Sequence, residues 1–173
     1  MGLTVTRFAS LLFAALALAP TLAHLLELPN KIGLSRDDYL IVQHTYRGWA
    51  WLGFVVAGAL LSTLVLMLMV RNRPKLFALT AIAFVCILGT QIVFWTFTFP
   101  ANQQTNNWTV LPENWTALRA QWEYSHAASA VLNLIAFISL VCSVLADRTD
   151  ARPNPALHWS SRKRRSAPPA TGQ

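Results

Sequence analysis

The fold is decided by an apolar stretch that reads GWAWLGFVVAGALLSTLVLMLMV and runs from Gly48 to Val70 without a charged residue. About 20 apolar residues are enough for a helix to cross a hydrocarbon core about 30 Å thick. Comparable stretches run from about residue 8 to 28, from 76 to 99 and from 122 to 145. Because backbone amides find no water inside a bilayer, all four segments should be helical. The sequence therefore predicts an all-α fold, an integral membrane four-helix bundle.

The overall composition agrees with a membrane protein. Of the 173 residues, 54% are hydrophobic and only 12% are charged, and the mean hydropathy is +0.41. We expect a membrane domain over residues 1–147, followed by a basic tail over 148–173 that is disordered. The net charge of +7 is densest in this tail. A basic tail beside a membrane span favours contact with anionic lipid, so nucleic acid is not an expected partner.

Positive charge also indicates how the chain is oriented. The link from Arg71 to Lys75 is short and cationic, whereas residues 101–113 contain no Lys or Arg. Cationic links stay on the cytoplasmic side, so we expect both termini to be cytoplasmic in a plasma (inner) membrane. Lys31, Arg36 and Arg47, in the first outer loop, argue for the opposite orientation.

The amino-terminal segment can also be read as a secretory leader. Arg7, the apolar run after it and the small residues Ala19 and Ala23 form the pattern of a cleavable signal peptide. However, the apolar run continues past Ala23 to Leu28 and is long enough to span. We therefore expect the segment to be retained as the first span.

The first outer loop has the signals of a short interfacial helix. Ser35 is a typical N-cap, and Asp38 stands at the third helical position. These residues predict a helix over 37–46 at the membrane surface. Because proline lacks an amide hydrogen, Pro29 is expected to end the first span and Pro100 the third.

Two short polar motifs occur in opposite sequence order, His24-x-x-Glu27 in the first span and Glu123-x-x-His126 in the fourth. If these spans are antiparallel, a rise of about 1.5 Å per residue places each Glu about 4.5 Å nearer the outer surface than its His. Ionisable residues inside a span are costly and mark functional sites. We therefore predict one site in which His24 and His126 form one layer and Glu27 and Glu123 another, and these four are the catalytic candidates.

Further candidates come from the same region. Residues three and four apart share a helix face, so Arg119, Trp122, Glu123 and His126 form one stripe that should face the bundle interior. The interfacial helix can close the site from above. From these positions, the candidates for substrate contact are Trp122, Trp108, Arg119 and His44.

Three chemistries fit two His and two Glu side chains. His24, Glu27, Glu123 and His126 could together bind a transition metal such as iron, copper or zinc. The two His could instead ligate haem from both sides, which we regard as the weaker cofactor hypothesis. Without a cofactor, a His–Glu pair could act as a general base. A purely structural alternative pairs Arg119 with Glu123 and leaves both His as hydrogen-bonded residues of the bundle.

These residues also carry a resemblance to a known family. The chain resembles the small four-helix membrane proteins of the anthrone-oxygenase-like family, many of which are known only as a domain of unknown function. The resemblance rests on His24-Leu-Leu-Glu27-Leu-Pro29-x-Lys31, Val42-Gln43-His44-Thr-Tyr46, Asn106-Asn107-Trp108 and Leu118-Arg119-x-x-Trp122-Glu123-Tyr124-x-His126-Ala127. Fungal members oxidise anthrones to anthraquinones with dioxygen, without an established cofactor. The resemblance implies that His126, Trp122 and Asn107 lie in the substrate pocket.

The functional hypothesis is thus a membrane-embedded oxygenase or oxidoreductase. Its substrate would be a hydrophobic small molecule, aromatic or quinone-like, that arrives from the lipid. The alternative is a non-enzymatic structural or accessory subunit, and either protein could be an oligomer. A transporter is disfavoured because four spans without a broken-helix pair do not match the usual transporter folds.

Overall fold

The computed structural model describes residues 1–150, and it confirms an all-helical fold with four helical stretches long and apolar enough to cross a membrane. The predicted basic tail lies outside the described residues, apart from the last turn of the final helix. The elements are α1 (Gly2–Lys31), α2 (Arg36–Gln43), η1 (His44–Tyr46), η2 (Trp49–Trp51), α3 (Leu52–Met69), α4 (Pro74–Val93), η3 (Phe94–Thr98), α5 (Phe99–Gln104) and α6 (Trp115–Asp150).

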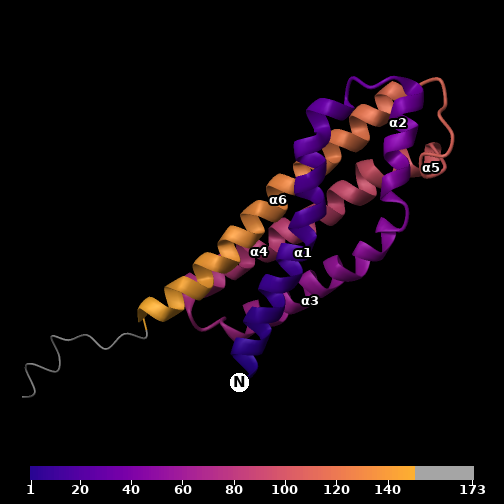
Figure 1. The fold of residues 1–173 in the computed structure, drawn as a ribbon. Coiled ribbons are helices and arrows are strands. Elements are labelled where there is room, and N and C mark those ends of the chain that lie inside the picture. The colour runs from indigo at the N-terminus through magenta and orange to yellow at the C-terminus, as the bar shows by residue number, and fades with distance from the viewer. Residues whose placement is uncertain (151–173) are drawn as a thin grey trace, which may run out of the picture.

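The four long helices form a bundle in which α1 and α4 each pack against both α3 and α6. Figure 1 shows α2 and α5 gathered at one end of the bundle, which we call the α2 end. The amino terminus and the carboxyl end of α6 lie at the opposite end. Helices α1 and α6 are therefore antiparallel neighbours, which is the arrangement that the two inverted motifs require.

Small side chains let the helices approach closely, as is usual where lipid offers no hydrophobic driving force between them. The buried positions include Ser10, Ala14 and Ala17 on α1, Ala59 and Thr63 on α3, Thr80 and Ala83 on α4, and Ala136, Ser139 and Ser143 on α6. Large apolar residues such as Phe8, Phe54 and Val85 instead lie on the outside of the bundle. This inside-out distribution fits contact with a lipid bilayer.

The contact between α1 and α3 gives a testable prediction. A Cβ added at Gly58 would lie 2.7 Å from the Phe13 ring, whereas one added at Gly53, on the same helix, would meet nothing within 4 Å. We expect Gly58→Ala to lower the free energy of unfolding by about 1–3 kcal/mol, because the ring must move within a packed interface. Unfolding in mixed micelles with increasing SDS measures this. Gly53→Ala is the control and should be neutral or slightly stabilising, so equal effects at both positions would contradict the assignment.

At the end opposite α2, one carboxylate connects three parts of the chain. Asp147 on α6 accepts from Arg7 on α1 at 2.6 Å and also pairs with Arg73 in the link before α4. These ion pairs hold the amino-terminal end of α1 against α6.

Both predictions that a proline would end a span are wrong. Helix α1 continues through Pro29, and the Ile32 amide still donates to the Leu28 carbonyl at 3.0 Å. Proline removes its own amide hydrogen bond and crowds the carbonyl of residue i−4, and α1 ends only two residues after Pro29. The third span likewise continues past Pro100, through the π-helical segment η3 into α5. Lys31 and Asn102 therefore lie on helices and not in loops.

The short helix expected over residues 37–46 is confirmed, as α2 followed by the 3-10 turn η1. The Ser35 hydroxyl accepts the amide of Asp38 at 3.3 Å and donates to its carboxylate at 2.6 Å. This local capping fixes where α2 begins and places its Tyr39 over the bundle, where the side chain is fully buried.

Candidate functional site

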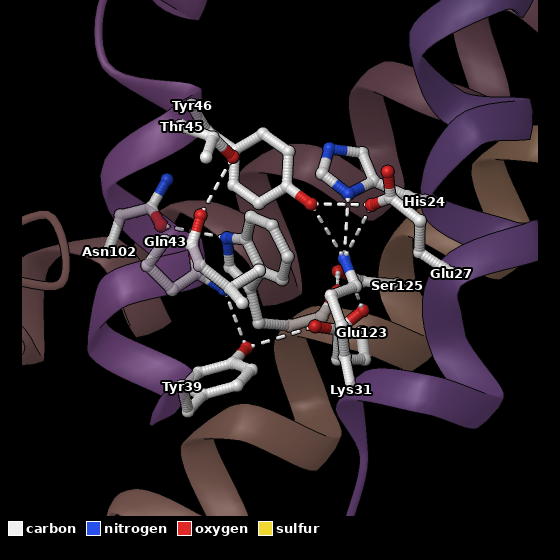
Figure 2. Close-up of polar contacts among 12 residues, drawn as sticks. His24, Glu27, Lys31, Tyr39, Gln43, Thr45, Tyr46, Asn102, Glu123 and Ser125 are labelled. Atoms are coloured by element: carbon white, nitrogen blue, oxygen red, sulfur yellow. Dashed lines mark hydrogen bonds and ion pairs between the residues drawn. The ribbon is translucent and has the colours of Figure 1, made fainter. Parts of the chain in front are cut away.

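The centre of the candidate site is the ammonium group of Lys31. Its Nζ lies 3.2 Å from a carboxylate oxygen of Glu27, 3.2 Å from one of Glu123, 3.2 Å from Nδ1 of His24 and 3.1 Å from the hydroxyl of Tyr46. Figure 2 shows these contacts converging on one nitrogen. Lys31 is only 3% exposed and Glu123 is fully buried. We call these five residues the Lys31 cluster.

The cluster fixes the hydrogen-bonding role of His24. An ammonium group can only donate, so Nδ1 of His24 must accept from Lys31. A neutral imidazole that accepts at Nδ1 carries its proton on Nε2. His24 therefore offers one N–H donor on the side away from Lys31.

The two histidines lie against each other, as the inverted motifs predicted. The ring centroids of His24 and His126 are 4.3 Å apart with 28° between the planes. The indole of Trp122 packs edge-on against both, 4.3 Å from His126 and 4.9 Å from His24. His126 makes no hydrogen bond within the described part of the chain, so its ring nitrogens are available to a ligand.

A second chain of hydrogen bonds reaches Glu123 from α2. Gln43 donates to the hydroxyl of Tyr39 at 2.7 Å, and Tyr39 donates to Glu123 at 3.1 Å. Burial, together with the neighbouring Glu123 carboxylate, raises the pKa of Tyr39 above its ordinary value. The phenol therefore stays protonated and stays a donor, which satisfies the second oxygen of Glu123.

Within the Lys31 cluster, Tyr46 connects the buried ammonium to the surface of the bundle. Its hydroxyl donates to Glu27 at 2.5 Å, and the side chain of Glu27 is 46% exposed. Burial and the hydrogen bond to Glu27 raise the pKa of Tyr46. A continuous polar contact thus runs from buried His24 through Lys31 and Tyr46 to an exposed carboxylate.

A cavity of about 790 Å³ lies beside these histidines, between α1, α3, η3, α5 and α6. Its aromatic wall includes Tyr46, Trp49, Phe94, Trp95, Trp108 and Trp122, together with His24 and His126. The polar lining includes Gln43, Gln91, Thr98, Asn102, Asn107 and Asn133. A mostly apolar pocket with a few convergent polar groups is typical of a small-molecule site.

The predicted site residues divide into three groups. His24, His126, Trp122, Trp108 and Asn107 line the cavity. Glu27 and Glu123 belong to the Lys31 cluster, next to the cavity but not on its wall. The remaining two, Arg119 and His44, are not among the lining residues.

Arg119 and His44 lie away from the cavity wall, and their expected contact with a substrate stays a prediction. Arg119 donates to the Leu34 carbonyl at 2.7 Å and lies over the Trp115 ring, so it fastens the interfacial segment to α6. It does not pair with Glu123, whose cationic partner is Lys31. His44 is exposed, because it follows α2 in the turn η1 with its side chain away from the bundle interior.

The metal site expected from His24, Glu27, Glu123 and His126 is not formed. Within the described residues, no group of three or more His, Cys, Asp or Glu side chains is placed to hold a metal ion. The position between the two carboxylates is taken by the Lys31 ammonium. The stacked rings also do not fit axial ligation of haem, because imidazole lone pairs lie in the ring plane and do not converge between stacked faces.

The site residues that were not predicted from the sequence include Lys31, Tyr39, Gln43, Tyr46 and Asn102. Lys31 lies four residues after Glu27 and seven after His24, a spacing that places all three on one face if the helix continues. For Asn102 the signal was weaker, because it was one of several amides in an expected loop. Its Oδ1 accepts the indole N–H groups of both Trp108, at 3.1 Å, and Trp122, at 2.9 Å.

The motifs behind the family resemblance are brought together in space. His24, Asn107, Trp122 and His126, which are far apart in the sequence, line one cavity. Membership of the anthrone-oxygenase-like family stays a prediction from those motifs. Comparison of this chain with protein-family models, with curated proteins and with solved structures finds no match.

Proposed function

We propose that this protein is a membrane-embedded oxidoreductase that oxidises a planar aromatic molecule with dioxygen. The observation that carries the proposal is the placement of His126 on the wall of an aromatic cavity, with neither ring nitrogen hydrogen-bonded to any residue that the structure describes. A half-buried imidazole without a hydrogen-bond partner among the described residues is an available base. The resemblance to anthrone oxygenases supports the choice of dioxygen as the oxidant.

The proposed reaction converts an activated methylene group between aromatic rings to a carbonyl group. One CH₂ and one O₂ give one C=O and one H₂O, so the substrate supplies all the electrons. His126 removes a proton from the substrate and leaves an electron-rich anion. The anion reduces dioxygen and forms a hydroperoxide, which loses water to give the ketone. The Nε2–H of His24 donates to the oxygen on which negative charge develops.

The Lys31 cluster would have a positioning role in this reaction. Lys31 holds the tautomer of His24 through the contact at Nδ1. Glu27 and Glu123 in turn hold the ammonium at 3.2 Å each. None of the three lines the cavity, so each acts through His24 and not on the substrate itself.

The same proposal includes an orientation in the membrane. The cationic link from Arg71 to Lys75 lies at the end of the bundle opposite the α2 end. The positive-inside tendency then places both termini in the cytoplasm of a cell with a plasma or inner membrane, and the cavity in the outer half. An aromatic substrate dissolved in lipid reaches a cavity at this depth without crossing water.

The test uses the protein in lipid nanodiscs with a hydroxylated anthrone. We expect oxygen uptake above that of empty nanodiscs, with one O₂ consumed for each anthraquinone formed. Quenching of tryptophan fluorescence by the quinone product measures binding independently, because Trp108 and Trp122 line the cavity. Binding without turnover would favour a binding or accessory protein, and the absence of both would contradict the proposal.

A further inference from the structure

We propose that Asn102 is the hydrogen-bond donor that recognises an acceptor oxygen on the aromatic ligand. The inference rests on the proposed function, because it assigns a chemical class to the molecule in that cavity. With this role for Asn102, the ligand would be a planar aromatic ketone or quinone and not a hydrocarbon.

The first step is that the orientation of the Asn102 amide is fixed. The indoles of Trp108 and Trp122 have only N–H donors, and both reach the same atom of Asn102, at 3.1 and 2.9 Å. Only the amide oxygen can accept two donors. The NH₂ group must therefore be on the other side, and Figure 2 shows the Asn102 nitrogen pointing away from the indole that contacts its oxygen.

The second step is that this NH₂ group is unused. In the part of the chain that the structure describes, no protein acceptor lies within hydrogen-bond distance of the Asn102 nitrogen. Asn102 is one of the residues that line the cavity, and we infer that its two unused N–H groups face the ligand. When the oxygen of an amide already accepts two hydrogen bonds and its N–H groups are free, the amide favours ligands that carry an oxygen acceptor.

The third step concerns where that oxygen would lie relative to the histidines. Trp122 connects the two regions, because its indole nitrogen contacts Asn102 while its rings pack against His126 and His24. A planar molecule lying along Trp122 places one edge at Asn102 and another at the histidines. The ligand would therefore carry a carbonyl oxygen at one edge and a proton-releasing group at a second edge.

The neighbouring amide of Gln43 brings an acceptor to the cavity wall. One of its two N–H groups donates to Tyr39, at 2.7 Å, so Gln43 keeps its acceptor oxygen and one N–H. The cavity thus offers a donor at Asn102 and an acceptor at Gln43. This pair suits a molecule that combines a ketone with a hydroxyl group.

The experiment compares two ligands of the same ring shape, anthraquinone and anthracene, in nanodiscs at pH 8. Concentrations are counted per lipid, and binding is measured by quenching of tryptophan fluorescence. We expect the wild-type protein to bind anthraquinone about three- to tenfold more tightly than anthracene, the size of one or two net hydrogen bonds. Asn102→Asp retains the oxygen that accepts from both Trp108 and Trp122, but a second oxygen replaces the NH₂ group, so the side chain has no N–H to donate.

In Asn102→Asp the preference for anthraquinone should disappear while the binding of anthracene stays within a factor of two. Gln103→Glu makes the same chemical change at the adjacent, exposed position and should leave the preference unchanged. If wild type binds both ligands equally, or if Asn102→Asp keeps the preference, the inference is wrong while the proposed function stands. If wild type binds neither ligand, the proposed function is wrong and the inference falls with it.

Discussion

Lys31→Met should lower the free energy of unfolding by about 3–5 kcal/mol, the usual cost of breaking a buried ion pair from one side. The substitution retains the length of the side chain but removes the charge. Glu123 is fully buried, so its carboxylate would keep only the hydrogen bond from Tyr39. Glu27 is half-exposed and can turn to water. The loss of stability therefore comes chiefly from Glu123, and unfolding in mixed SDS micelles measures it.

The double variant Lys31→Met with Glu123→Gln tests that explanation. Removing both charges leaves no unpaired carboxylate in the bundle, so most of the lost stability should return. Lys75→Met is the matched control, because Lys75 is exposed at the start of α4 and should change stability little. A double variant as unstable as Lys31→Met alone would show that packing and not charge is responsible.

His126→Gln should reduce the rate of anthrone oxidation by about 10²- to 10⁴-fold, the usual contribution of a general base. The glutamine side chain is similar in length to that of histidine and can form hydrogen bonds, but it cannot accept a proton at neutral pH. Binding of the quinone should change by only a few-fold, because the aromatic wall remains. Oxygen uptake gives the rate, and tryptophan quenching gives the binding.

His44→Gln makes the same substitution at an exposed histidine outside the cavity, and it should leave both quantities unchanged. An equal loss of rate in the two variants would mean that neither histidine acts on the substrate. A loss of binding in His126→Gln as large as the loss of rate would make His126 a binding residue only.

Long-range features of the site could be predicted from the sequence because topology links them. Four spans of alternating direction bring the first and last helices together as antiparallel neighbours. The rise per residue then matches His24 to His126 and Glu27 to Glu123 without any knowledge of side-chain geometry. The N-cap at Ser35 could be predicted for a local reason, since capping depends on residues only three apart.

Two of the missed residues, Lys31 and Asn102, lie just beyond prolines that were expected to end their helices. Ending the first span at Pro29 put Lys31 in a loop, so the four remaining side chains looked like a metal site in need of a cation. The cation is supplied by the chain itself, one turn beyond Glu27. Ending the third span at Pro100 hid Asn102 in the same way. Arg119 was the wrong partner for Glu123. The buried carboxylate pairs instead with Lys31, which lies on the neighbouring helix α1.

The π-helical segment Phe94–Thr98 lies between α4 and α5 within the third span. A π turn contains about one residue more than an α turn, and in an α-helix each residue turns the face by about 100°. Deleting a single residue here would restore a regular helix and leave Asn102 on nearly the same face, because one π turn covers about the same rotation as an α turn that is one residue shorter. The π turn therefore lets the third span contain one extra residue without changing which residues beyond η3 face the cavity.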